Sequence, residues 1–159
     1  LDHHPDIFCM SKGLTGGFMP MGITSVSKRV VASFDSKEYT RTFWHGHSYT
    51  ANPLACAAAN ASFDLLMLAE CQQRIGQIVR SHQLFVNELV NHPKLTRAQA
   101  QGTILALEMN VTDSGYTSAI RDRMYDYFLE RNILLRPLGN VLYILPPYVI
   151  SPEALNRLY

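Results

Sequence analysis

The chain has 159 residues, of which 47% are hydrophobic and 17% charged, with a formal net charge of +1. This composition is typical of a globular protein with a buried core, and no basic cluster predicts binding to nucleic acid or to an anionic membrane. No apolar stretch reaches the roughly 18 residues that a membrane helix needs, and no signal peptide opens the sequence. We therefore expect a cytoplasmic protein without a nucleic-acid or membrane partner.

The cysteines and the chain ends add two expectations. The cysteines are odd in number and scattered among apolar neighbours, which favours small buried side chains over a disulfide framework or a metal site: Cys9, Cys56 and Cys71. The sequence starts without methionine, and its last eight residues read as a helix that ends after two turns. We expect a piece of a longer chain, in which His3 and His4 belong to a solvated loop.

The first predicted element is a buried strand over Ile7–Met10, followed by Lys12 and the glycine-rich turn Gly13–Gly17. Glycines let the backbone bend sharply and approach a ligand closely. A lysine at such a strand end can be partly desolvated, which frees its amine for Schiff-base chemistry. The alternative is a lysine that flanks a loop and points into water. The turn is not a nucleotide P-loop, because its lysine precedes the glycines.

Short elements and a long helical region follow. The short ones are a strand over Met21–Val26, a helical segment over Ser27–Phe34 and a strand over Arg41–Trp44. Asn52–Pro53 predicts a helix start, because asparagine caps helices and proline at the first helical position loses no hydrogen bond. An alanine-rich stretch and an apolar face then continue to His92–Pro93 as one helix, or as two helices that break near Glu70–Gln73.

The segment His45–Thr50, just before the capped helix, combines imidazoles, glycine and hydroxyls. Its two histidines would share a face of an extended backbone, but the third and fourth ligands of a zinc site are missing at the usual spacing. Anion binding suits the segment better, because Gly46 and the hydroxyls of Ser48 and Thr50 can present donors to a phosphate. A plain loop is the alternative.

The second half predicts an α+β arrangement. Its elements are a strand over Thr103–Met109, a turn over Thr112–Gly115, a helix over Thr117–Glu130, and strands over Ile133–Arg136 and Val141–Leu145. Arg136 lies where a buried strand emerges into a proline-stiffened turn, so its guanidinium could bind a carboxylate or simply extend from the strand end into water. Tyr143 could line the same pocket, or belong to the core with a solvated hydroxyl.

Three segments resemble, in order and spacing, the class III pyridoxal-phosphate (PLP) aminotransferases: Asp6–Gly17, Trp44–Ala59 and Leu135–Tyr148. The resemblance runs from Asp6 to the end of the chain. It implies the α/β fold of the fold-type I PLP-dependent transferases. Residues 1–62 would be the C-terminal portion of the large mixed-sheet domain, residues 63–94 a connecting helix region, and residues 95–159 an incomplete α+β small domain.

The resemblance also implies roles for individual residues. Lys12 matches the lysine that holds PLP covalently and later moves a proton between substrate and cofactor. Arg136 matches the arginine that receives the carboxylate of the keto substrate, and Tyr143 lies in the neighbouring segment. Gly46, His47 and Ser48 match a loop that contacts the cofactor phosphate of the neighbouring subunit. Gly46 also matches a position that contacts the substrate. The implied partners are an amino donor, a keto acid and a second copy of the chain, with no metal.

Within this class, the resemblance implies amino transfer from S-adenosylmethionine to 7-keto-8-aminopelargonate in biotin biosynthesis. Another ω-aminotransferase activity, on acetylornithine, ornithine or a diamine, is the alternative, and a non-catalytic remnant is a second. The family's aspartate that pairs with the pyridine nitrogen, its ring-stacking aromatic residue and its main phosphate-binding turn belong upstream of this sequence. Without that aspartate the cofactor is a poorer electron sink. We therefore predict that this chain alone neither holds PLP tightly nor turns over.

Overall fold

The computed structural model describes residues 4–159, so that His3 lies outside the described residues. The chain divides into two compact units, the first ending at Leu68 and the second spanning Ala69–Tyr159. No single helix in the described part is long and apolar enough to cross a membrane, and only the bent pair of consecutive helices Pro53–Met67 and Ala69–Glu88 meets the length and composition criteria when taken together. Each unit is described by itself below.

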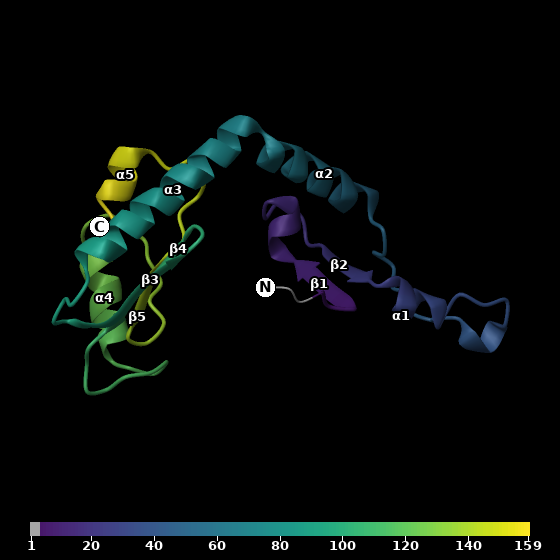
Figure 1. Cartoon of the computed structure of the whole chain (residues 1–159), viewed down its shortest axis with the longest axis horizontal. Coiled ribbons are helices and arrows are strands. Elements are labelled where there is room, and N and C mark those ends of the chain that lie inside the picture. The colour runs from purple at the N-terminus through teal and green to yellow at the C-terminus, as the bar shows by residue number, and fades with distance from the viewer. Residues whose placement is uncertain (1–3) are drawn as a thin grey trace. The chain divides into compact units, whose positions relative to one another are not determined.

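The first unit contains a two-stranded antiparallel sheet of β1 (Ile7–Ser11) and β2 (Gly22–Val26), seen in Figure 1 at the purple end of the chain. A 3₁₀ turn, η1 (Lys12–Thr15), follows β1 directly. The short helix α1 (Lys28–Ala32) begins after β2, and η2 (Tyr39–Arg41) is a second 3₁₀ turn. The prediction of a strand over residues 41–44 is wrong, because η2 occupies its start and the rest forms no ladder.

The helix α2 (Pro53–Met67) begins where the sequence predicts it. The side chain of Asn52 accepts a hydrogen bond from the Leu54 amide at 3.0 Å, and Pro53 occupies the first helical position. A Cβ added to Gly16 would lie 3.3 Å from the Ser62 Oγ, so the turn after η1 and this helix are in close contact. The small side chains of α2 permit this approach.

The helix α3 (Ala69–Glu88) opens the second unit. The two helices are separated at Leu68, whose ψ of 137° leaves the helical region. The helical region is therefore two helices, with the break two residues before the expected position, and the second one ends at Glu88, before His92–Pro93.

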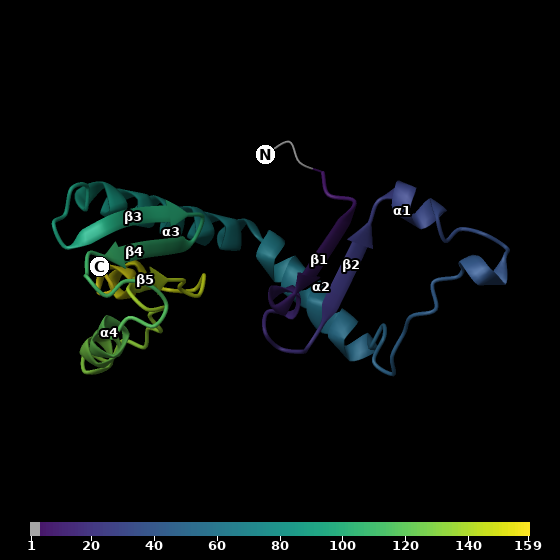
Figure 2. The same ribbon diagram turned by 90° about the horizontal axis from the view of Figure 1, so that it is seen from below.

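A three-stranded antiparallel sheet forms the centre of the second unit, in the order β3–β4–β5. Its strands are β3 (Leu95–Gln101), β4 (Ile104–Met109) and β5 (Val141–Ile144). In Figure 2, α3 runs along the β3–β4 hairpin, and α4 (Ile120–Leu129) lies beyond β5; α5 (Pro152–Asn156) is the last element. The strand expected over residues 133–136 does not form, whereas β3 was not predicted.

The hydrophobic core of the described residues lies in the second unit. It contains side chains from β4, α4 and β5, namely Leu105, Leu107, Met124, Leu142 and Ile144. In the described part of the first unit, only Thr15 and Ala55 are buried. The expectation of a buried first strand is therefore wrong, since Ile7 and Phe8 are 55% and 52% exposed. Cys9 in the same strand is likewise exposed rather than buried.

Candidate functional site

Lys12 is the first residue after β1, and its backbone has a φ of +54°. This left-handed conformation costs a non-glycine residue about 1–2 kcal/mol, and such conformations cluster at functional sites. The side chain is exposed, so the expected partial desolvation is absent from this unit. Within residues 4–159, no hydrogen bond or ion pair engages the Lys12 amine.

The turn after Lys12 is held by Thr15, which is almost fully buried. The Thr15 hydroxyl donates to the Met19 carbonyl at 2.5 Å and accepts from the Met19 amide at 3.1 Å. Gly16 and Gly17 have φ of +62° and +83°, conformations that favour glycine. The glycine-rich turn therefore fixes the backbone next to a lysine whose own side chain remains unpartnered in the described structure.

The predicted phosphate-binding loop is a tight turn just before α2. The Tyr49 amide donates to the Nδ1 of His47 at 3.1 Å, so Nδ1 is an acceptor. The His47 amide donates to the Thr50 hydroxyl oxygen at 3.1 Å, and the Thr50 amide donates to the His47 carbonyl at 2.9 Å. Gly46 and Ser48 are exposed, and no described contact uses the Ser48 hydroxyl. His47 and Thr50 thus shape the turn, while Ser48 stays free to bind a ligand.

Arg136 lies in the second unit, at the edge of a cavity of about 320 Å³. The walls are the segment 116–122 at the start of α4 and the segment 136–139. Arg121 also lines the cavity, but it donates a hydrogen bond to Asp122 at 2.7 Å, whereas no described carboxylate pairs with the Arg136 guanidinium. Arg136 is therefore the uncompensated cation of this cavity and is suited to binding a carboxylate.

Ser118 is a residue of this cavity that the sequence did not reveal. It is only 3% exposed, and its Oγ is the buried side-chain atom without a hydrogen-bond partner in the described part of the chain. An unpaired buried hydroxyl costs free energy, so such an atom marks a place where a further partner can bind. No sequence pattern distinguishes Ser118 from the other hydroxyl residues of the chain.

Tyr143 occupies the centre of β5, opposite Ala106 of β4. Its neighbours Leu142 and Ile144 belong to the core, so the alternation of the strand places Tyr143 on the other face of the sheet. It does not line the cavity of Arg136. The structure places Lys12 and the segment 46–48 in one unit and both Arg136 and Tyr143 in the other, with no hydrogen bond between Lys12 and that segment.

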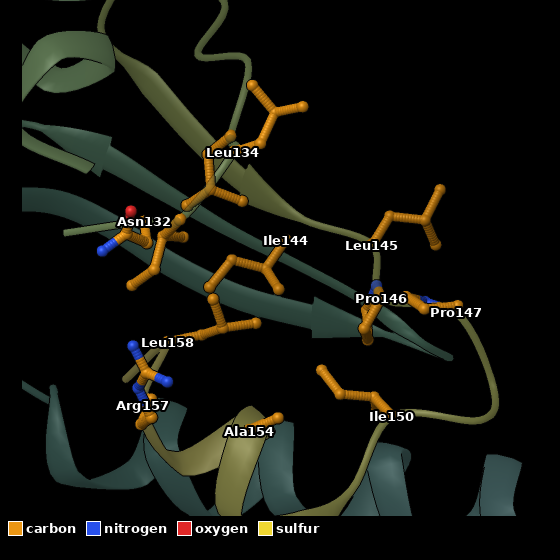
Figure 3. Close-up of a pocket in the computed structure, with 12 residues that line it drawn as sticks. Asn132, Leu134, Ile144, Leu145, Pro146, Pro147, Ile150, Ala154, Arg157 and Leu158 are labelled. Atoms are coloured by element: carbon orange, nitrogen blue, oxygen red, sulfur yellow. The ribbon is translucent and has the colours of Figure 1, made fainter. Parts of the chain in front are cut away.

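A second cavity of the second unit, of about 300 Å³, is shown in Figure 3. Apolar side chains of residues 133–135, β5 and the following loop line it, and Arg157 is the charged residue among its lining. Figure 3 shows Leu134 and Leu145 at one side and Ala154 of α5 at another. None of the residues singled out from the sequence as site residues contributes to this cavity.

Comparison with known proteins gives a consistent result over the whole sequence. The family described as aminotransferase class-III matches residues 1–159. An adenosylmethionine-8-amino-7-oxononanoate aminotransferase from Synechococcus elongatus is 44% identical over 98% of this chain and 36% of its own length. A bifunctional dethiobiotin synthetase/7,8-diamino-pelargonic acid aminotransferase from Arabidopsis thaliana is 33% identical over 97% of this chain and 19% of its own length. The chain thus spans about a third or less of these relatives.

Solved structures give the same picture. The adenosylmethionine-8-amino-7-oxononanoate aminotransferase from Methanocaldococcus jannaschii matches with a TM-score of 0.85 and 28% identity, covering 98% of this chain and 37% of that one. An amine transaminase from an uncultivated Pseudomonas species, solved in its PLP-bound form, matches with a TM-score of 0.81 and 25% identity, covering 96% of this chain and 36% of that one.

Proposed function

The chain belongs to the class III aminotransferases, and we propose that it supplies the catalytic lysine and the carboxylate-binding arginine of an enzyme of biotin biosynthesis. The proposed reaction transfers an amino group from S-adenosylmethionine to 7-keto-8-aminopelargonate. The similarity that carries this proposal is the 44% identity with the Synechococcus elongatus enzyme over nearly the whole chain. The protein acts in this proposal as a cytoplasmic homodimer with shared active sites.

The residues present fit pyridoxal phosphate as the cofactor. Lys12 offers an unpartnered amine at a strand end, next to glycines that hold an open turn. The exposed hydroxyl of Ser48, with Gly46 and His47 around it, can donate to a phosphate. When bound, PLP supplies the electron sink that stabilises a carbanion at the reacting carbon.

The chain's own residues have three tasks in this proposal. The Lys12 amine binds the cofactor covalently and afterwards moves a proton at the reacting carbon. The Ser48 hydroxyl holds the phosphate of the neighbouring subunit's cofactor, as its loop precedes a helix start. Arg136 binds the carboxylate of the keto acid through its two-pronged guanidinium, and Tyr143 contacts the substrate from β5, outside the cavity of Arg136.

A covalent-labelling experiment tests the role of Lys12 independently of turnover. The full-length protein is incubated with PLP, treated with borohydride to reduce the Schiff base, and digested for mass spectrometry. We expect the phosphopyridoxyl mass on the peptide that contains Lys12, and none on Lys28 or Lys37, which serve as internal controls. Labelling spread equally over these lysines would contradict the proposal.

The amino donor is tested by half-reaction spectroscopy on the PLP-loaded protein. S-adenosylmethionine is expected to change the visible absorption spectrum, because only a true amino donor converts the cofactor to its aminated form. Acetylornithine, ornithine and a diamine are the matched comparison. A response to one of these and none to S-adenosylmethionine would replace the proposed reaction with another ω-aminotransferase activity.

A further inference from the structure

The segment Pro137–Val141 is a closed turn that begins directly after Arg136. The Leu138 amide donates to the Val141 carbonyl at 2.9 Å, and the Val141 amide donates to the Leu138 carbonyl at 3.0 Å. Pro137 is fully buried, and its ring fixes its own φ. The backbone that carries the Arg136 side chain is therefore continuous with a stiff turn, so any contact that anchors the turn also anchors the arginine.

Asn140 makes that anchoring contact. Its side chain is only 3% exposed, and its Oδ1 accepts from the Gly115 amide at 2.9 Å while its Nδ2 donates to the Met109 carbonyl at 3.1 Å. Its backbone carbonyl also accepts from the Met109 amide at 2.8 Å. One carboxamide thus joins the turn, the end of β4 and the loop at Gly115.

The residues that directly follow Gly115 form the opposite wall of the Arg136 cavity. The Gly115 carbonyl accepts from the Ser118 amide at 3.1 Å, so the hydrogen bond from Asn140 continues to the residues that line the cavity. Gly139 packs so tightly on this loop that a Cβ there would lie 1.8 Å from the Gly115 carbonyl oxygen. The two walls of the cavity are therefore fixed to each other through Asn140 and Gly139.

From this geometry we propose that Asn140 is a positioning residue for substrate binding, which sets the distance between the Arg136 guanidinium and the wall formed by residues 116–118. The inference rests on the proposed function, in which Arg136 binds the carboxylate of the keto acid. Loss of the Asn140 carboxamide would free the Gly115 loop, because the Gly115 amide loses its acceptor and the Met109 carbonyl loses a donor. The guanidinium would then face a wider cavity and bind a carboxylate less well.

Steady-state kinetics with 7-keto-8-aminopelargonate and its methyl ester test this proposal in the full-length protein. For Asn140→Ala we expect the KM for the acid to rise roughly tenfold, in line with a weakened hydrogen bond to a charged group. The KM for the ester and the kcat should stay within about twofold of the wild type, because the ester lacks the charge that Arg136 recognises. Asn140→Ser, which keeps a hydroxyl under the loop, replaces the alanine variant if that one does not fold, with the same selective change expected.

The controls separate positioning from general destabilisation. Asn110→Ala, which removes an exposed amide bonded to the Pro93 carbonyl elsewhere in the same unit, should leave both KM values unchanged. Suppose that Arg136→Ala raises the KM for the acid but not for the ester. Then an equal rise of both KM values in the Asn140 variants, or no rise of either, would overturn the inference about Asn140 and leave the proposed role of Arg136 intact. If Arg136→Ala does not discriminate acid from ester, the proposed role of Arg136 fails and the inference fails with it.

Discussion

At Gly139 the backbone has a φ of +59°, and it lies against the loop at Gly115 without room for a side chain. The change Gly139→Ala therefore carries two costs, roughly 1–2 kcal/mol for a left-handed residue with a Cβ and about 1–3 kcal/mol for overpacking. We expect Gly139→Ala to lower the free energy of unfolding by the sum of these two costs. The measurement is the urea-induced unfolding transition of the second unit.

Gly102 is the matched control for this prediction. It has a φ of +57° in the hairpin between β3 and β4, and nothing lies within 4 Å of an added Cβ. Gly102→Ala should therefore show only the conformational cost, and the difference between the two variants isolates the clash. Equal losses in both variants would mean that the Gly115 loop moves aside freely.

His82 is a buried titratable residue outside the proposed site. Its ring lies between the Tyr159 hydroxyl, 2.7 Å from Nδ1, and the Thr103 carbonyl, 3.2 Å from Nε2. Because a carbonyl can only accept, Nε2 carries the proton and Nδ1 accepts from the tyrosine. Burial lowers the pKa of His82 below its usual 6.5, and burial also raises the pKa of Tyr159 to about 12.

This arrangement predicts how stability depends on pH. The pKa of His82 is lower in the folded state, so the unfolded chain binds more protons once the pH falls below 6.5. The stability contributed by neutral His82 is thus complete above pH 6.5 and is lost as the pH falls through the folded pKa. Urea denaturation from pH 8 to pH 5 should show this loss in the wild type and a shallower loss in His82→Gln. Parallel curves would contradict the prediction.

At the scale of single elements, the cap of α2 explains why this helix could be located from sequence. Asn52 accepts from the Leu54 amide, and removing such a cap costs about 0.5–2 kcal/mol. Asn52→Ala should reduce the hydrogen-exchange protection of the first turn of α2 in the full-length protein by that amount. Asn60→Ala, at an exposed position in the middle of the same helix, should increase protection slightly, because alanine has the higher helix propensity. Changes of the same sign would refute the capping role.

The errors in predicting strands have one physical cause. A local sequence pattern indicates whether a segment is buried, but it does not indicate whether the segment pairs with another strand. Residues 133–135 are an apolar run, but the Ile133 amide donates to the Phe128 carbonyl at the end of α4 instead of entering a ladder. The strand β3 alternates small and polar residues, and an irregularity between Leu95 and Arg97 shifts its register. Its pairing with β4 could not be deduced from its own residues.

The residues of the candidate site also divide into those with a local sequence signal and those that only the folded structure reveals. Lys12, Ser48 and Arg136 could be chosen from sequence, because each lies beside a signal that can be recognised locally: a glycine-rich turn, a capped helix start and a proline-stiffened turn, respectively. The contact of Asn140 with Gly115 joins residues 25 positions apart and leaves no local signal. The unpaired Ser118 hydroxyl has no local signal either, since burial of its oxygen depends on the folded cavity. The exposure of Lys12 agrees with the alternative of a lysine that points into water, whereas the burial of the strand before it was wrongly predicted from the apolar residues of β1.

At the scale of the whole molecule, stabilising contacts are distributed unevenly between the two units. The hydrophobic cluster lies in the second unit, where Phe85, Leu89 and Phe128 pack around it. In the first unit, large apolar side chains are exposed in both strands and in α2, including Phe8, Phe63 and Leu65. Burial of apolar surface is the main favourable term in folding. This chain produced by itself should therefore have a stable second unit and a first unit that opens readily.

Limited proteolysis of the isolated chain tests this expectation and the retention of the cofactor together. We expect early cleavage within residues 34–50, where no long helix or strand forms, and a persistent product that contains α3 to α5. Addition of PLP should not slow this cleavage, because the first unit of the isolated chain does not hold the cofactor tightly. Leu105→Ala, which removes a fully buried core side chain at a cost of about 2–5 kcal/mol, should make the second unit sensitive as well. A first unit that resists protease as long as the second, or that PLP protects, would show that the hairpin and α2 form a stable cofactor site without further partners.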